Sequence, residues 1–200
     1  MTEHEKNQEP LNEERVPPRP EKKENSLWEL IKFALLAVAI VIPIRAFVAQ
    51  PFIVSGLSMF PTFHDGDYLI VDEISYRFED PARGDVVIFR YPKDPSKFFI
   101  KRIIGLPGEE LILSGEKIRI KNAEHPEGFE LAESYVKNIS TSMTDITLGA
   151  DQYFVMGDNR SASSDSRAWG TLPKNLITGR ALVRLLPIKD IEFFPGEANY

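Results

Sequence analysis

The 200-residue sequence contains no cysteine. This absence excludes disulfide bonds, thiolate metal sites and a cysteine nucleophile. Histidine is scarce too, with three residues that lie far apart in the chain: His4, His64 and His125. No HExxH or comparable pairing occurs, so the sequence predicts no zinc site.

An excess of positive charge is also missing. The chain has 24 Lys and Arg against 30 Asp and Glu, a net charge of −6, whereas a nucleic-acid-binding protein typically carries a clustered basic face. The composition therefore argues against a nucleic-acid partner. With 42% hydrophobic and 10% aromatic residues, the chain can bury the core of one domain of ordinary size, with appendages.

No uninterrupted apolar run reaches the length of a membrane span. The charge-free run covers residues 33–44 between Lys32 and Arg45, and a span needs about 20 residues. Residues 27–30 and 46–49 supply the missing length if Lys32 and Arg45 extend to the two interfaces. We therefore expect a transmembrane anchor over residues 27–50.

A buried core helix and a cleaved signal peptide are the alternatives for this segment. A core helix would show a polar face, and residues 33–44 show none. A cleavage site needs small residues at positions −1 and −3 just after the apolar run. Ala49 fits the first position, but Phe47 is too bulky for the second. The pattern favours an uncleaved anchor.

Flanking charge predicts the orientation. Residues 1–26 are rich in Glu, Lys, Asn and Pro, which is typical of a disordered tail. The basic residues before the apolar run are Lys6, Arg15, Arg19, Lys22, Lys23 and Lys32, and after Arg45 the next is Arg77. The positive-inside rule then places the tail in the cytoplasm and residues 51–200 outside the plasma membrane, after a single pass.

Residues 51–200 carry the pattern of a mainly β, antiparallel domain. Short segments rich in Val, Ile, Phe and Tyr end at Gly, Pro, Asp or Asn, which is typical of strands. The expected strands cover residues 68–72, 85–90, 98–104, 110–113, 117–120, 152–156 and 177–186. Residues 113–116 predict a hairpin turn. Residues 121–150 are polar without clear period and are expected to form an excursion from the domain.

Lys101 is a candidate general base. Residues of equal parity share a face of a strand, so Phe99 and Ile103 lie beside Lys101. Apolar neighbours disfavour the ammonium form of a lysine and lower its pKa, as base catalysis near neutral pH requires. The alternative is an ordinary edge lysine with its charge in water, a description that also fits the neighbouring Arg102.

Ser58 is a candidate nucleophile. Gly56 and Pro61 favour an irregular loop, and such a loop can present a hydroxyl group and its own N–H to a substrate. A serine is a weak nucleophile without a base. His64 is one alternative base, although no Asp in a triad-like context follows it. Taken alone, the local pattern favours Ser58 as a plain turn residue. The composition of residues 157–170 likewise fits a solvated surface loop.

Taken together, these segments resemble the motifs of type I signal peptidases, in the same order and over about residues 32–187. The matching segments are residues 55–62, 83–87, 99–109, 157–160 and 163–167. Members of this family are membrane-anchored serine proteases that use a Ser–Lys dyad. The resemblance implies that Ser58 is the nucleophile, that Lys101 is the base, and that no metal or cofactor is needed.

The resemblance also implies roles for neighbouring residues. Ser163 is expected to hydrogen-bond and orient the Lys101 amine. Two structural ion pairs are expected in the same loop, Asp165 with Arg167 and Asp158 with Arg160. Some family members carry a hydroxyl residue where this chain has Gly56, and that side chain helps to hold the oxyanion. Here the Ser58 N–H is the one clear donor.

The activity implied is cleavage of N-terminal signal peptides from exported preproteins through an acyl-enzyme, with small residues at positions −1 and −3. The implied partners are the signal peptides and the lipid bilayer, and a contact with the secretion machinery is compatible with this function. A self-cleaving repressor with a Ser–Lys dyad would instead need a DNA-binding module and no anchor. A tethered β domain that only binds partners would need degenerate dyad segments. The sequence does not determine the oligomeric state or which preproteins are cut.

Overall fold

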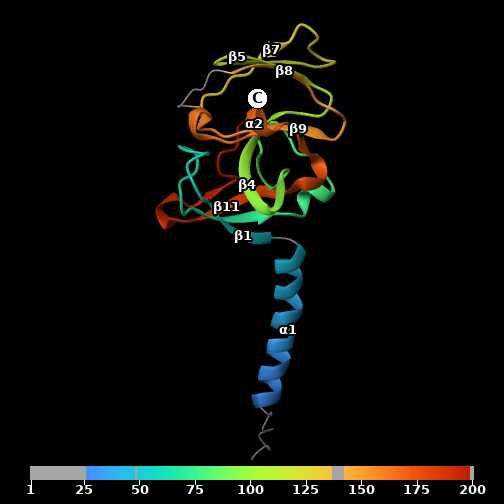
Figure 1. Cartoon of the computed structure of the whole chain (residues 1–200). Coiled ribbons are helices and arrows are strands. Elements are labelled where there is room, and N and C mark those ends of the chain that lie inside the picture. The colour runs from blue at the N-terminus through green and yellow to red at the C-terminus, as the bar shows by residue number, and fades with distance from the viewer. Residues whose placement is uncertain (1–25, 48, 137–141, 199–200) are drawn as a thin grey trace, which may run out of the picture. The chain divides into compact units, whose positions relative to one another are not determined.

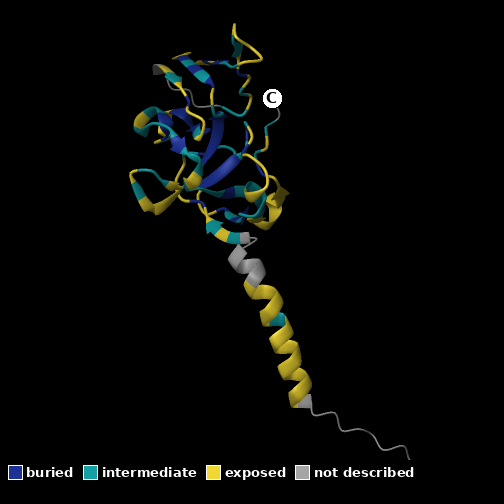
Figure 2. Cartoon of the chain, turned by 90° about the vertical axis from the view of Figure 1, so that its right-hand side faces the viewer, coloured by how far each residue is buried: buried dark blue, intermediate teal, exposed yellow. Residues whose placement is uncertain are grey.

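The computed structural model describes residues 26–47, 49–136 and 142–198 (Figure 1). Almost all of the expected N-terminal tail therefore lies outside the described residues. Helix α1 spans Ser26–Phe47, and along residues 27–42 nearly every side chain is exposed (Figure 2). Among the described residues, no helix combines the length and the mean hydropathy that crossing a membrane requires.

The rest of the described chain is built mainly of short strands. They are β1 Ala49–Ile53, β2 Tyr68–Asp72, β3 Val86–Tyr91, β4 Asp94–Gly105, β5 Glu110–Gly115, β6 Lys117–Lys121, β7 Phe129–Glu130, β8 Ser142–Thr147, β9 Gln152–Met156, β10 Leu172–Pro173, β11 Ile177–Leu186 and β12 Glu192–Phe193. The short helix α2 covers Ser166–Trp169, and 3-10 turns cover Ser75–Arg77, Arg160–Ala162, Lys174–Leu176 and Ile188–Asp190.

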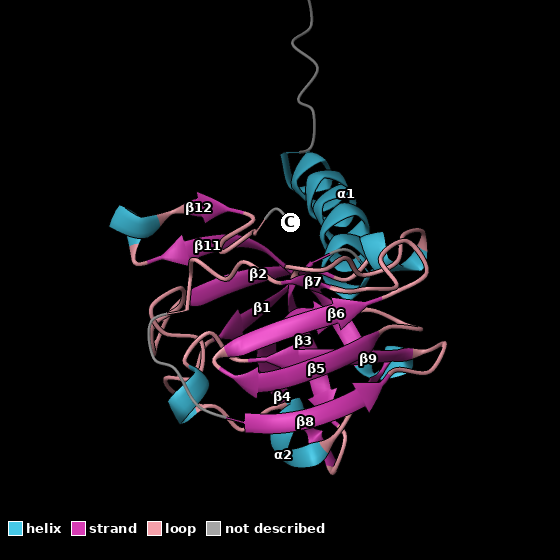
Figure 3. Cartoon of the chain, turned by 90° about the horizontal axis from the view of Figure 1, so that it is seen from above, coloured by secondary structure: helices cyan, strands magenta, loops and turns pink. Residues whose placement is uncertain are grey.

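These strands form two antiparallel sheets. The larger, 8-stranded sheet has the order β1-β2-β11-β3-β4-β9-β10, with β12 paired to β11, and the smaller, 4-stranded sheet has the order β7-β6-β5-β8. Figure 3 shows β5, β6 and β8 side by side in the smaller sheet. The prediction of a mainly antiparallel β domain is confirmed, and each expected strand overlaps an observed one.

Two expected boundaries are wrong. Ala49 and Gln50, assigned to the anchor, belong to β1 and pair with Asp72 and Val71 of β2. Within the expected excursion 121–150, β8 pairs with β5 along the smaller sheet. Residues 142–147 are therefore part of the β domain and not an excursion from it. Residues 137–141 lie outside the described residues. The sequence of β8 is mostly polar and does not alternate, so its local pattern did not indicate the strand that pairs with β5.

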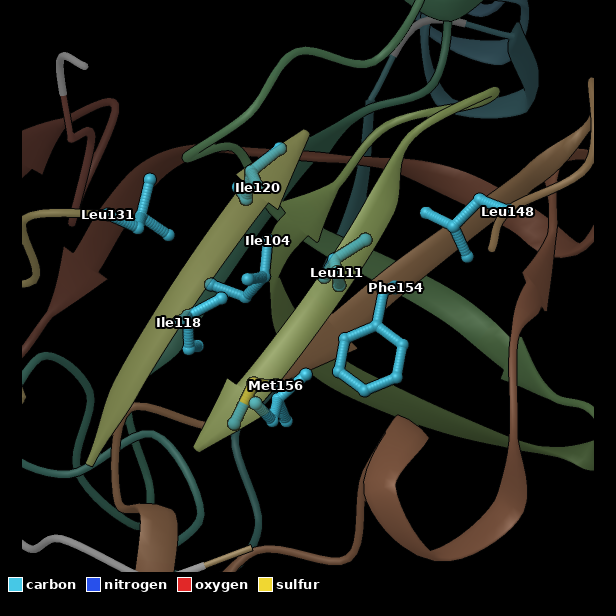
Figure 4. Close-up of a cluster of buried hydrophobic side chains, with 9 residues drawn as sticks. Ile104, Leu111, Ile118, Ile120, Leu131, Leu148, Phe154 and Met156 are labelled. Atoms are coloured by element: carbon cyan, nitrogen blue, oxygen red, sulfur yellow. The ribbon is translucent and has the colours of Figure 1, made fainter. Parts of the chain in front are cut away.

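Strand β4 joins three buried apolar clusters. Ile104 packs with Leu111, Phe154 and other side chains between the two sheets (Figure 4). Ile103 belongs to a second cluster and Ile100 borders a third. Burying each such side chain stabilises the fold by about 1.5–3 kcal/mol. This packing fixes the position and direction of β4, which carries Lys101.

Candidate active site

The loop between β1 and β2 carries Ser58, and buried neighbours hold it in place. Met59 is 1% exposed and Phe63 is fully buried, and both pack against Leu69 of β2. Because Met59 is buried in the core, the position of the neighbouring, half-buried Ser58 side chain is restricted. The expected loop is confirmed.

Lys101 lies on β4 opposite Val87 of β3 and is 4% exposed. Its Nζ donates a hydrogen bond of 2.7 Å to Ser58 Oγ and one of 2.8 Å to the carbonyl oxygen of Ile100. The same Nζ lies 5.4 Å from the centre of the Phe99 ring. The structure therefore brings together the two residues that the sequence singled out.

Burial changes the acidity of this amine. Desolvation lowers the pKa of Lys101 from 10.5 to about 8, although the negative charges of Asp165 and Asp158 oppose the shift. A lysine in this state is partly neutral near physiological pH, and a neutral amine can accept a proton. An edge lysine with its charge in water is thereby excluded.

The alternative base, His64, is not supported. Its side chain is exposed and its ring packs edge-on against Phe60, with 5.3 Å between ring centres. The hydrogen bond at Ser58 Oγ comes instead from Lys101.

The segment after β9 braces the Ser58 loop. The Asn159 N–H donates to the carbonyl oxygen of Ser58 over 3.0 Å, and Asn159 Nδ2 donates to the carbonyl oxygen of Leu57 over 3.0 Å. Asp165 caps α2 and accepts a hydrogen bond of 3.1 Å from the Gly157 N–H. The segment therefore supports the Ser58 loop through direct hydrogen bonds.

The expected Asp165–Arg167 pair is present, with 2.7 Å between Oδ2 and Nη2. Burial opposes ionisation of Asp165, but the hydrogen bonds and charge of Arg167 outweigh it and hold the pKa of the carboxyl below its usual value. Arg167 Nη2 also donates to the carbonyl oxygen of Arg160 over 2.7 Å. Through these contacts Arg167 connects the two ends of the segment 160–167.

The expected Asp158–Arg160 pair is wrong. Asp158 accepts two hydrogen bonds from the Arg102 guanidinium, at 2.8 Å and 2.6 Å, and Arg160 pairs with Glu133. Arg102 is fully buried and not solvated, because it points away from Lys101 across β4 and finds a buried carboxylate there. Strand alternation could have placed Arg102 on that face. Nothing in the sequence indicated Glu133.

Ser163 does not make the expected bond to Lys101. Its Oγ is buried and has no hydrogen-bond partner of standard geometry within the described part of the chain. It lies against the Cα of Gly157, where a Cβ would come within 2.3 Å of Oγ. Ser163 packs beside the Ser58 loop, and its hydroxyl is near enough to the Asp165 carboxyl to help lower the pKa of that group. Gly157 must remain glycine for the close approach of Ser163.

An apolar cleft opens beside the Ser58–Lys101 pair. It has a volume of about 450 Å³ and includes both residues in its wall. The lining side chains are mainly apolar, and among them are Phe52, Leu69, Ile88, Phe98 and Ile100. In the described residues, no group of three or more His, Asp or Glu could hold a metal ion. A serine hydroxyl hydrogen-bonded to a partly neutral amine is an arrangement that can perform acyl transfer.

Comparison with known proteins agrees with this chemistry. Residues 27–186 match the family described as "Signal peptidase, peptidase S26". The chain is 38% identical over 182 residues to "Probable signal peptidase I-2" of Synechocystis sp., covering 88% of this chain and 81% of that protein. It is 39% identical over 179 residues to "Signal peptidase I" of Leptolyngbya laminosa, covering 84% and 83%. With "Signal peptidase I" of Bacillus amyloliquefaciens it shares 34% identity over 204 residues, covering 96% and 98%. A family match over most of the chain, together with relatives aligned over 81–98% of their own length, leads to one conclusion: the chain belongs to the signal peptidase family, peptidase S26.

Proposed function

We propose that this chain is a serine endopeptidase that removes signal peptides from preproteins, with Ser58 as nucleophile and Lys101 as general base. The observation that carries the assignment is the 2.7 Å hydrogen bond between Lys101 Nζ and Ser58 Oγ. The substrate class follows from membership of the signal peptidase family. The apolar cleft beside the pair supports binding of a peptide.

The reaction begins when the neutral Lys101 amine accepts the proton of the Ser58 hydroxyl and Oγ attacks the scissile carbonyl. The Ser58 N–H forms no backbone hydrogen bond within the described residues and is available to the oxyanion. One such donor contributes about 10²–10³ in rate. The Lys101 ammonium then protonates the leaving amine, which frees the mature chain and leaves the signal peptide as an ester on Ser58. Water, deprotonated by the same amine, hydrolyses the ester.

The cleft beside the dyad is the proposed binding site for the substrate side chains next to the scissile bond. Its apolar wall, which includes Phe52, Leu69 and Ile88, is suited to apolar side chains of an extended peptide. The resemblance to type I signal peptidases implies small residues at positions −1 and −3, and we propose the same preference for this chain. Bulky residues placed at these positions of a preprotein should lower kcat/KM, whereas the same change further along the mature chain should not.

We further propose that α1 holds the enzyme at the plasma membrane, with the N-terminus in the cytoplasm and the β domain, which begins at Ala49, outside. Large apolar side chains are exposed along the helix, for example Trp28 at 57% and Phe33 at 71%. The 25 residues before the helix contain five basic residues, whereas after Arg45 the next basic residue is Arg77. Protease added outside intact spheroplasts should digest the β domain. Release of the chain by alkaline carbonate, or protection of the β domain until lysis, would contradict this placement.

The central test is processing of a preprotein by the purified full chain in detergent. We expect a single new N-terminus at the signal-peptide junction, identified by sequencing the product. The Ser58→Ala variant, matched for folding by circular dichroism, should yield no product. Equal processing by Ser58→Ala would remove Ser58 from the mechanism, and absence of processing by the wild-type chain would remove the proposed substrate class.

A further inference from the structure

Glu133 connects the smaller sheet to the scaffold of the dyad. It lies beyond β7, and its side chain is 9% exposed where it meets the 5% exposed side chain of Arg160. Arg160 Nη1 donates to Glu133 Oε2 over 2.7 Å, and Nη2 donates to Oε1. A bidentate pair of this kind fixes the orientation of the guanidinium as well as its position.

Tyr135 extends this contact to a second arginine. Its hydroxyl donates to Glu133 Oε1 over 2.8 Å, and its ring lies 4.0 Å from Cζ of Arg102. Arg102 directly follows Lys101 on β4 and is fully buried. One short segment, carrying Glu133 and Tyr135, therefore contacts both buried arginines.

Each of these two arginines is connected to one member of the dyad, Arg160 to Ser58 and Arg102 to Lys101. Arg160 Nε donates to the carbonyl oxygen of Gly157 over 3.1 Å, and two residues further on the Asn159 N–H holds the Ser58 carbonyl oxygen. Arg102 directly follows Lys101 on β4 and donates to Asp158, which lies between Gly157 and Asn159. This hydrogen bond restrains β4 next to Lys101. The route from Glu133 to Ser58 thus passes through Arg160 and the backbone between Gly157 and Asn159.

We propose that Glu133 and Tyr135 are positioning residues for the Ser58–Lys101 pair. Neither residue lines the cleft beside the dyad, so they act through Arg160 and Arg102 and not on the substrate. The proposal rests on the assignment of Ser58 and Lys101 as the reacting residues. It gives part of the polar segment 121–150 a role in the reaction.

The physical reason is the cost of a buried, unpaired charge. Without the Glu133 carboxylate, the Arg160 guanidinium would have to move toward water, because an uncompensated buried cation is strongly unfavourable. That movement would release the carbonyl oxygen of Gly157 and loosen the backbone that holds Ser58. A misplacement of about 1 Å at the reacting atoms can cost about 10²-fold in rate.

The test is Glu133→Gln in the full chain, with kcat and KM measured on a preprotein. We expect kcat to fall by about 10–100-fold, as for other residues that orient catalytic groups, with KM within about twofold of wild type because the cleft is untouched. The matched control is Glu130→Gln. Glu130 pairs with Lys117 in an exposed contact on the same sheet, so both constants should stay within about twofold.

A double-mutant cycle separates positioning from a general loss of stability. Arg160→Gln combined with Glu133→Gln should have the same kcat as Arg160→Gln alone, because both changes interrupt one route. Additive losses, or a raised KM with unchanged kcat, would overturn the proposal.

Thermal unfolding shows whether Glu133→Gln is folded. If it is not, Tyr135→Phe decides, since it keeps the ring over Arg102 and removes only the hydroxyl group; we expect kcat to fall by about threefold, the loss of one modest hydrogen bond, with KM unchanged. Wild-type kcat in the folded variant would overturn the proposal. Ser58→Ala, assayed in parallel, tests the dyad separately: its residual turnover would refute the dyad itself.

Discussion

Lys101 Nζ donates a hydrogen bond of 2.7 Å to Ser58 Oγ across 43 positions of sequence. The two residues do not lie on neighbouring strands, because β2, β11 and β3 separate β1 from β4 in the larger sheet. The Ser58 loop reaches Lys101 because Met59 and Phe63 are buried in the same cluster as Ile88 of β3. The geometry of the dyad therefore depends on the packing of this cluster.

Lys101→Ala should abolish processing while the fold remains intact. Removing one member of a nucleophile–base pair typically costs about 10⁴-fold or more in kcat. Single-turnover cleavage of a preprotein, with a circular-dichroism spectrum of the variant, is the measurement. Near-normal turnover in a folded Lys101→Ala protein would show that another group is the base.

The acylation rate should rise with pH through about 8, the value to which burial lowers the pKa of Lys101. Below that value the rate should change about tenfold per pH unit, because only the neutral amine can accept the Ser58 proton. A profile of kcat/KM between pH 6 and pH 10 reports the free enzyme. A flat profile around pH 8 would contradict the role of Lys101.

Lys101→Met should stabilise the protein at pH 7 while it inactivates the enzyme. The pKa of Lys101 falls from 10.5 to about 8 on folding, so burying its charge costs up to about 3 kcal/mol below the folded pKa. Between these two values the unfolded chain binds more protons, and the wild-type free energy of unfolding rises with pH. Urea denaturation should show an advantage of Lys101→Met at pH 7 that shrinks toward pH 10. An advantage independent of pH would show that packing, not charge, is responsible.

Gly56 should not tolerate a side chain. Its φ is +89°, with open space around the position of a Cβ, so the obstacle is backbone strain of about 1–2 kcal/mol. Gly56→Ala and Gly56→Ser should both lower turnover by a similar factor. Kinetics on the two folded variants test this expectation. A Gly56→Ser enzyme that matches wild type beside a weakened Gly56→Ala would show instead that a serine hydroxyl there helps to hold the oxyanion.

Arg102→Met should strongly destabilise the fold. The change leaves the fully buried Asp158 carboxylate without the guanidinium that pairs with it, and breaking a buried pair costs about 3–5 kcal/mol. The control is Lys117→Met, which removes an exposed pair with Glu130 and should cost less than about 1 kcal/mol. Urea denaturation of both variants at pH 7 measures the difference. Equal losses in the free energy of unfolding would mean that the buried Arg102–Asp158 pair stabilises the fold no more than an exposed pair does.

The sequence by itself determined the strands and the candidates for the dyad. Alternation of apolar residues and turn residues predicts β2 and β9 with their observed bounds. The apolar neighbours Phe99 and Ile103 predict a desolvated Lys101 and hence its lowered pKa. These features are local, since strand parity and turn chemistry act between residues a few positions apart.

Only the tertiary structure decided which charged groups meet. Asp158 pairs with Arg102, and Arg160 pairs with Glu133, 27 positions away. Periodicity says which face of a strand a side chain occupies, but not which loop covers that face. The partner of a buried charge is set by which carboxylate the packed sheets bring within reach, because no buried charge is stable alone. For this reason the sequence indicated the dyad candidates and the local Asp165–Arg167 pair, but not the pairs of Arg102 with Asp158 and of Arg160 with Glu133.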